Sequence, residues 1–335
     1  MCLPAAVCFR FPVLLPVFHS NLPTERMIPL NPPRQTLRGS LLLMLGSVIW
    51  GFAFAAQRMG MDYMQPISFN GIRNMMAGLC LIPVCAFAER RAPGTKPRTR
   101  AEWMLQLRGG LFCGIFLFAA STLQQAGLVE SSAGKAGFIT ALYVVLVPVF
   151  AWLLFRRNPG SWLWISILMA VVGLYLLCVP AGEVFSLSRS DLLLVGCAAC
   201  FTGEILSVDR FSPWVSNVRL SRDMFLICGS LGVLLSLFTE TISWSGIRQA
   251  MPALLYAGIM SGAVGYTLQI LGQRDVSPAL ASVIMCLESV FSVLGGALVL
   301  QERLSGREIW GCAIMFGAVI LAQLSPLLKK AAHRS

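Results

Sequence analysis

Long stretches without a single charged residue constrain this chain more than any other feature of its sequence. Six windows contain no Asp, Glu, Lys or Arg: residues 39–57, 109–129, 136–155, 158–182, 249–273 and 309–328. A helix needs about 20 mostly apolar residues to cross the hydrocarbon core of a bilayer. Each window meets this length, so each is predicted to span a membrane.

The composition also favours a membrane protein. Only 12% of the 335 residues are charged and 56% are hydrophobic, whereas about a quarter of the residues of a soluble domain are charged. In a soluble domain the net charge of +11 would suggest a nucleic-acid partner. In a membrane protein it is better explained by Lys and Arg in cytoplasmic loops, and we predict no nucleic-acid partner.

Shorter charge-free runs flank Arg73, Glu204 and Glu288, and residues 224–239 form one further apolar run. The flanking runs become full spans only if the three charged residues lie inside the membrane. Ten spans follow, at about 40–57, 65–87, 108–126, 132–155, 161–179, 191–211, 221–240, 251–271, 277–299 and 306–325. Because backbone groups in lipid must be hydrogen-bonded within the protein, these runs are predicted to be helices. The predicted fold is an all-α polytopic membrane protein with ten transmembrane helices.

Basic residues are unevenly divided between the two sides of such a chain. If both termini are cytoplasmic, the inner segments hold 18 of them: Arg26, Arg34, Arg38, Arg90, Arg91, Lys96, Arg98, Arg100, Arg108, Arg156, Arg157, Arg210, Arg219, Arg222, Arg274, Lys329, Lys330 and Arg334. The outer segments hold 6: Arg58, Lys135, Arg189, Arg248, Arg303 and Arg307. Lys and Arg favour cytoplasmic loops, so this division supports an even number of spans, both termini inside and a location in the cytoplasmic membrane.

Two halves of the chain are related by a shift of 145 residues. The shift lays residues 277–281 (SPALA) over residues 132–136 (SAGKA), and it places Glu288 at the position of Tyr143. The copies are five helices apart, and an odd number inverts the second copy across the membrane, as in many carriers. We therefore predict an N-terminal extension at 1–37, inverted five-helix repeats at 38–180 and 188–325, and a basic cytoplasmic tail at 326–335.

The first 26 residues differ from the rest of the chain. They contain four prolines and no basic stretch ahead of the apolar part, so they do not match a signal peptide. Met27 stands just before the first basic cluster and is expected as an alternative start.

Charged residues inside a bilayer are costly, about 2.5–3.5 kcal/mol at the centre of a helix, and are therefore candidates for function. Glu288 lies near the middle of the ninth span, beside Ser292 and Gly295 on a small, polar face. In one interpretation it binds a substrate or carries a proton. In the other it forms a structural ion pair that holds two helices together. Glu204 lies on a similar face of the sixth span, beside Ser207, and is a second candidate proton carrier.

Arg73 lies inside the second span and requires a partner for its charge. Glu288 or Glu204 could supply one, or the side chain could extend to the lipid headgroups. Asp209 and Arg210 follow Glu204 by about one helical turn and are predicted to pair at the end of the helix. Arg73, Asp209 and Arg210 are thus candidates for structural ion pairs.

Neutral polar side chains complete the candidate site. Trp50, Tyr143 and Gln269 lie within spans and are predicted to line a cavity with Glu204 and Glu288. No G-x-x-x-x-G-K-[ST], H-E-x-x-H or G-x-S-x-G motif occurs, which argues against an ATP-driven pump and against common membrane proteases and lipases. With 2 His, and with 11 Cys mostly in apolar runs, we predict no metal, no cofactor and no enzymatic activity.

Nine short motifs follow one another along the chain: 57–63 (QRMGMDY), 69–73 (FNGIR), 121–128 (STLQQAGL), 132–140 (SAGKAGFIT), 208–211 (VDRF), 266–269 (YTLQ), 277–278 (SP), 287–288 (LE) and 301–304 (QERL). In this order and spacing they resemble the EamA-type proteins of the drug/metabolite transporter superfamily, over about residues 38–325. The resemblance implies two EamA repeats, cytoplasmic termini and a central cavity lined by helices 1, 3, 4, 6, 8 and 9. It also implies export or exchange of small metabolites, such as amino acids. The sequence does not determine the oligomeric state, so a homodimer is left open.

Three positions depart from the family pattern, and one of them is Asn74, which replaces a usual apolar residue beside Arg73. Ser289 follows Glu288 where members often have proline, so the ninth helix is expected to be straighter. Glu204 stands where relatives usually have an aromatic residue or histidine, which puts a carboxylate on the cavity side of the sixth helix. This difference weakens any direct transfer of a substrate class from the family.

The predicted function is a secondary transporter of small metabolites that works by alternating access, without a covalent step. Proton coupling through Glu204 or Glu288 is a further hypothesis. One alternative is a membrane-embedded enzyme acting on lipid-linked substrates, which would need paired acids or a His cluster near an interface. Another alternative is a lipid scramblase or an assembly partner.

Overall fold

The computed structural model describes residues 33–91, 97, 99–128, 133–156, 158–179, 188–299 and 305–332. Every regular element within these residues is a helix, which confirms the predicted all-α fold. The elements are α2 (Pro33–Met61), α3 (Pro66–Arg91), α4 (Arg100–Leu128), α5 (Ala133–Ala141), α6 (Tyr143–Phe155), α7 (Ser161–Cys178), α8 (Arg189–Phe211), α9 (Asn217–Thr239), α10 (Trp244–Gln249), α11 (Met251–Leu255), η2 (Tyr256–Tyr266), α12 (Thr267–Gln273), α13 (Pro278–Met285), α14 (Leu287–Val299) and α15 (Gly306–Ala332). The segment before residue 33, the motif at 301–304 and the last residues of the tail lie outside the described residues.

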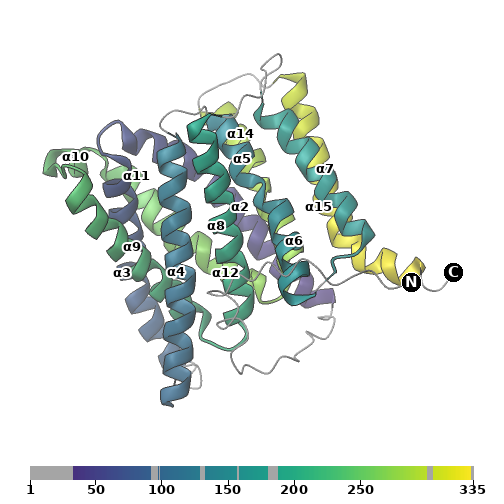
Figure 1. Ribbon diagram of the computed structural model, residues 1–335, viewed down its shortest axis with the longest axis horizontal. Helices are drawn as coiled ribbons and strands as arrows, with labels where there is room; N and C mark the ends of the chain where they lie inside the picture. Colours follow the sequence, from purple (N-terminus) through teal and green to yellow (C-terminus); the bar gives the residue numbers. More distant parts are fainter. Residues whose placement is uncertain are drawn as a thin grey trace, which may run out of the picture.

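Nine segments of the described chain are long and apolar enough to cross a membrane. The remaining predicted span, the ninth, corresponds to α13 and α14, whose apolar part, Pro278–Leu294, is shorter. The helices lie side by side (Figure 1) and turn large apolar side chains outward; Leu153, Leu168 and Phe238 are 67%, 65% and 82% exposed. Such a surface suits lipid rather than water. The predicted multi-pass architecture is confirmed.

The two halves of the chain have the same helix order. α7 begins at Ser161 and α15 at Gly306, which is 306 − 161 = 145 positions later, and the starts of α5 and α13 at Ala133 and Pro278 are also 145 apart. Two pairs of helices related by this shift pack against each other, namely α3 on α9 and α7 on α15. The last pair runs together along one edge of the molecule in Figure 1. A helix that touches its own repeat equivalent lies next to the axis relating the repeats, so these pairs surround that axis.

Glycines bring α3 and α9 into backbone contact. A Cβ atom on Gly229 would lie 2.4 Å from the backbone nitrogen of Met75, and one on Gly71 would lie 2.6 Å from that of Val233. These distances are too short for any side chain. Small residues allow such close approach in membranes, where packing contacts rather than hydrophobic burial hold helices together. The α3–α9 pair therefore depends on glycine at both positions.

The fourth and ninth spans each break near mid-length. α5 and α6 meet at Leu142, and α13 and α14 meet at Cys286. Next to each break the backbone closes a tighter turn than an α-helix does. The amide of Leu142 donates to the carbonyl of Ile139 at 3.2 Å, and the amide of Ser289 donates to the carbonyl of Cys286 at 3.2 Å. The two breaks lie next to each other, since the thiol of Cys286 donates to the carbonyl of Ala141.

The expectation of a straighter ninth helix, drawn from Ser289 in place of proline, is wrong. The helix breaks at Cys286 although no proline follows Glu288, and a hydroxyl of a neighbouring helix lies against the break. The hydroxyl of Ser47, on α2, has one proton to donate and lies 3.0 Å from the carbonyl oxygen of Leu43 in its own helix, 3.2 Å from that of Ile284 and 3.4 Å from that of Met285. Carbonyl groups freed by a tight turn in a membrane require such a partner within the protein.

We predict that Gly229→Ala weakens the fold, because the added methyl group meets the Met75 backbone and forces α3 and α9 apart. Overpacking of this kind costs about 1–3 kcal/mol of unfolding free energy. Gly196→Ala is the matched control, since its Cβ would meet only the Leu123 side chain, at 3.4 Å. Thermal unfolding of the purified protein in detergent measures both variants, and equal midpoints would contradict the close packing of the two helices.

Candidate functional site

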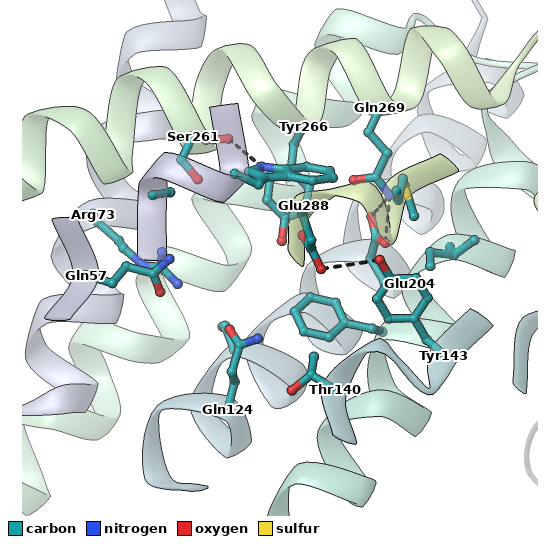
Figure 2. A pocket seen from close by; sticks show the side chains of 16 residues that line it. Gln57, Arg73, Gln124, Thr140, Tyr143, Glu204, Ser261, Tyr266, Gln269 and Glu288 are labelled. Atoms are coloured by element: carbon teal, nitrogen blue, oxygen red, sulfur yellow. Dashed lines mark hydrogen bonds between the residues drawn. The ribbon is translucent and has the colours of Figure 1, made fainter. Parts of the chain in front are cut away.

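A cavity of about 70 Å³ lies between the two halves. Its lining comes from α2, α3, α4, α5, α6, α8, η2, α12, α13 and α14, and Figure 2 shows polar side chains directed into it. All five side chains predicted from the sequence to line a cavity do so: Trp50, Tyr143, Glu204, Gln269 and Glu288. A single buried water requires about 10–15 Å³ by this measure, so the cavity has room for a few water molecules.

Two residues at equivalent positions of the repeats meet in this cavity. The hydroxyl of Tyr143, the first residue of α6, donates to Oε1 of Glu288 at 3.3 Å, and the two residues are 145 positions apart. A second such pair lies beside it, where the thiol of Cys286 donates to the carbonyl of Ala141 at 3.7 Å, again 145 positions apart. Glu288 also lies in the first turn of α14, where the helix dipole favours a negative charge. These contacts place the symmetry axis at the crossing of the fourth and ninth spans.

The second intramembrane carboxylate is held by an amide. Nε2 of Gln269, on α12, donates to both oxygens of Glu204, at 3.0 and 3.3 Å. The two side chains are only 1% and 2% exposed. No cation of the described residues forms an ion pair with either Glu204 or Glu288. Both carboxylates of the cavity are therefore held by neutral partners.

An aromatic wall closes one side of the cavity. Nε1 of Trp50 donates to the carbonyl of Ser261 at 3.2 Å, and the Trp50 ring meets the edge of Tyr266 with centroids 4.9 Å apart. Ser261 and Tyr266 belong to η2, a π-helical segment, and such segments are frequent at functional sites. A Cβ on Gly265 would lie 2.8 Å from Nε1 of Trp50, so this close approach requires glycine.

Arg73 also lines the cavity, with a partner that differs from the one expected. Its Nε donates to Oδ1 of Asn70 at 3.0 Å, one turn earlier on α3. None of the described carboxylates lies within 4.0 Å of its guanidinium, so a neutral amide stands where an acidic partner was expected. At 8% exposure, and facing the cavity, the side chain does not extend to the headgroups. Asp209 and Arg210 lie outside the cavity lining, and their pairing stays a prediction.

Several lining residues were missed by sequence reasoning. Gln57 follows Trp50 by seven positions, so two helical turns along the same face of α2 would have pointed to it. Tyr266 appeared in the sequence analysis only as the first residue of the motif at 266–269. Thr140 and Ser261 carried no signal, because hydroxyl side chains are common inside helices and often bond to their own backbone.

Comparison with known proteins assigns the chain to a family. A sequence model of the EamA-like transporter family matches residues 37–179 and residues 188–324. The chain belongs to this family. It is 29% identical over 288 residues to an uncharacterized transporter of Archaeoglobus fulgidus, with 86% of each chain covered. It is 23% identical over 286 residues to the uncharacterized inner membrane transporter YedA of Escherichia coli K12, covering 84% of this chain and 89% of the relative.

A solved crystal structure shares the fold. Its TM-score is 0.70 at 18% sequence identity, and the match covers 85% of this chain and 96% of that one. The predicted resemblance to the drug/metabolite transporters is confirmed by the two EamA matches. The EamA protein is therefore a multi-pass transporter that sits in a lipid bilayer and binds a small-molecule substrate, and it is not an enzyme.

We predict that Gln269→Leu lowers the unfolding free energy of this EamA protein by about 1–3 kcal/mol, because it removes the only hydrogen-bond donor that the described residues offer to the buried Glu204 carboxylate. Gln273→Leu, one turn along α12, is the matched control. Neither polar atom of the Gln273 side chain has a partner among the described residues, so its loss is neutral or stabilising. Thermal unfolding in detergent distinguishes the two, and equal effects would contradict a supporting role for Gln269.

Proposed function

We propose that this protein is a secondary transporter that exports or exchanges small polar metabolites, such as amino acids, across the cytoplasmic membrane by alternating access. The observation that carries the proposal is a cavity with polar and charged lining, placed where two repeat-related halves cross inside an apolar bundle. Polar and ionisable side chains at such a position mark substrate and ion pathways in membrane proteins.

Alternating access follows from the symmetry of the halves. The fourth and ninth spans cross at their breaks and touch through equivalent residues, Tyr143 with Glu288 and Ala141 with Cys286. Rocking one half against the other about this crossing would open the cavity first to one side of the membrane and then to the other. In this structure the cavity measures about 70 Å³, whereas ligand pockets usually measure about 300–1,000 Å³. Substrate entry therefore requires the helices to move apart.

The proposed site consists of the five cavity residues predicted from the sequence. Trp50 and Tyr143 offer aromatic faces, and Gln269 offers an amide. Glu204 and Glu288 are proposed to couple transport to protons, since each is held by a neutral donor that tolerates a change in carboxylate charge. In this scheme a proton and the substrate occupy the cavity in turn.

Flux measurements in proteoliposomes test this proposal. We expect a pH gradient to drive uptake of a radiolabelled amino acid by the wild type. The rate of this pH-driven uptake should fall by at least about tenfold in the Glu204→Gln/Glu288→Gln double variant, which removes both proposed proton carriers. Glu102→Gln, at an exposed carboxylate on α4, is the matched control and should transport as the wild type does. Unchanged pH-driven flux in the double variant would reject proton coupling. Lipid flipping without solute flux would favour the scramblase alternative.

A topology measurement tests the proposed orientation. With both termini cytoplasmic, a fluorescent protein fused after Ser335 should fold and fluoresce, and alkaline phosphatase inserted after Arg248 should be active outside the membrane. The converse pattern would reverse the assignment of the two sides.

A further inference from the structure

We propose that Arg73 binds a carboxylate group of the transported substrate, so that the substrate class is small carboxylates and zwitterions rather than cations. This inference rests on the proposed transport function and specifies the ligand of the same cavity. It gives Arg73 a role different from the structural ion pair expected from the sequence.

The charge of Arg73 is permanent and stands uncompensated at the cavity. A guanidinium stays protonated in proteins and carries five N–H donors. Only Nε is used, in its bond to Asn70 at 3.0 Å; neither terminal nitrogen has a hydrogen-bond partner among the described residues. Neither terminal nitrogen is among the fully buried atoms that lack a partner, and the side chain lines the cavity. The free donors are therefore directed at whatever occupies the cavity.

Hydrogen bonds hold the guanidinium in place. Oδ1 of Asn70 accepts from Arg73 and also from Nδ2 of Asn74, at 3.1 Å. Nδ2 of Asn70 donates to the hydroxyl of Ser121 at 2.8 Å, and this hydroxyl donates to the carbonyl of Leu117 at 2.7 Å. The chain of bonds joins α3 to α4 and fixes the Nε edge of the guanidinium. An arginine fork oriented in this way matches the two oxygens of a carboxylate.

The two ends of the cavity carry opposite charge. Figure 2 shows Arg73 beside Gln57 on one side, and Tyr143, Glu204 and Gln269 on the other. The carboxylates of Glu204 and Glu288 do not reach Arg73 to form an ion pair. Intramembrane charges of solely structural function normally pair with one another. A ligand with a carboxylate at the Arg73 end and a donor group at the other end would satisfy both ends of the cavity.

Binding of matched acids and amides tests the inference. The probes are acetate, L-alanine, L-leucine and benzoate, each beside its primary amide, which has nearly the same shape but no negative charge. Ligands that bind the folded state raise the unfolding midpoint, so dose-dependent thermal shifts of the purified protein give their affinities. We expect at least one acid to stabilise the wild type at concentrations where its amide does not.

Three variants connect the acid response to Arg73. Arg73→Gln should weaken acid binding by about 10- to 100-fold, which is the usual value of hydrogen bonds to a charged group. Arg73→Lys keeps the positive charge but lacks the paired N–H donors of a guanidinium. Its affinity for acids should therefore lie between those of Arg73→Gln and the wild type. Asn70→Asp keeps Arg73 and supplies an internal carboxylate at its Nε, so it should also weaken acid binding. If Arg73→Gln fails to fold, Asn70→Asp still tests the inference, because it leaves Arg73 in place.

Arg248→Gln is the matched control, because it removes one exposed positive charge that does not line the cavity and should keep the wild-type acid response. The inference is overturned if no acid of the set stabilises the wild type, if amides bind as well as their acids, or if Arg73→Gln and Asn70→Asp both retain the acid response. Counterflow in proteoliposomes separates this failure from failure of the proposed function. Transport of cationic solutes that Arg73→Gln leaves unchanged would keep the transporter and reject the carboxylate site, whereas no transport of any solute would reject both.

Discussion

Hydrocarbon offers no hydrogen-bond partner, so every polar group of this chain that lies in the membrane must be satisfied within the protein. This constraint explains the helices, and it also explains how two of them can break. At the break in the ninth span, the hydroxyl of Ser47 lies within hydrogen-bond distance of the carbonyl of Ile284, and the thiol of Cys286 donates to the carbonyl of Ala141. Polar side chains that are excluded from the lipid-facing surface gather instead around one cavity between the halves.

The contacts between repeat equivalents form the centre of the fold. Tyr143 meets Glu288 at the point where the fourth and ninth spans cross, and glycines on α3 and α9 bring a second pair of equivalent helices into backbone contact. The proposed transport mechanism uses this arrangement, because a motion of one half against the other changes access to the cavity without separating the packed pairs. In this proposal the carboxylates and the guanidinium contact a substrate that both halves enclose.

Most of the fold could be predicted because span length and apolar content are local properties of the sequence. The five cavity residues could be predicted for a related reason, since a polar residue inside an apolar span must face inward. The partner of Arg73 could not be predicted: Asn70 fills that place because it lies one turn away and is itself held by Ser121 of α4. The break in the ninth helix was missed because it occurs without proline, at a point where Ser47 of α2, far away in the sequence, packs against the chain.

The sequence by itself determined a helical membrane protein of two repeated halves with three charged residues at depth, because the cost of exposing backbone and charge to lipid leaves few alternatives. Only the tertiary structure decided that Glu288 meets Tyr143, that Glu204 meets Gln269 and that Arg73 meets neither carboxylate. The reason is physical: these partners come from helices far apart in the chain, and which of them meet depends on close packing between helices, which no local pattern of residues encodes.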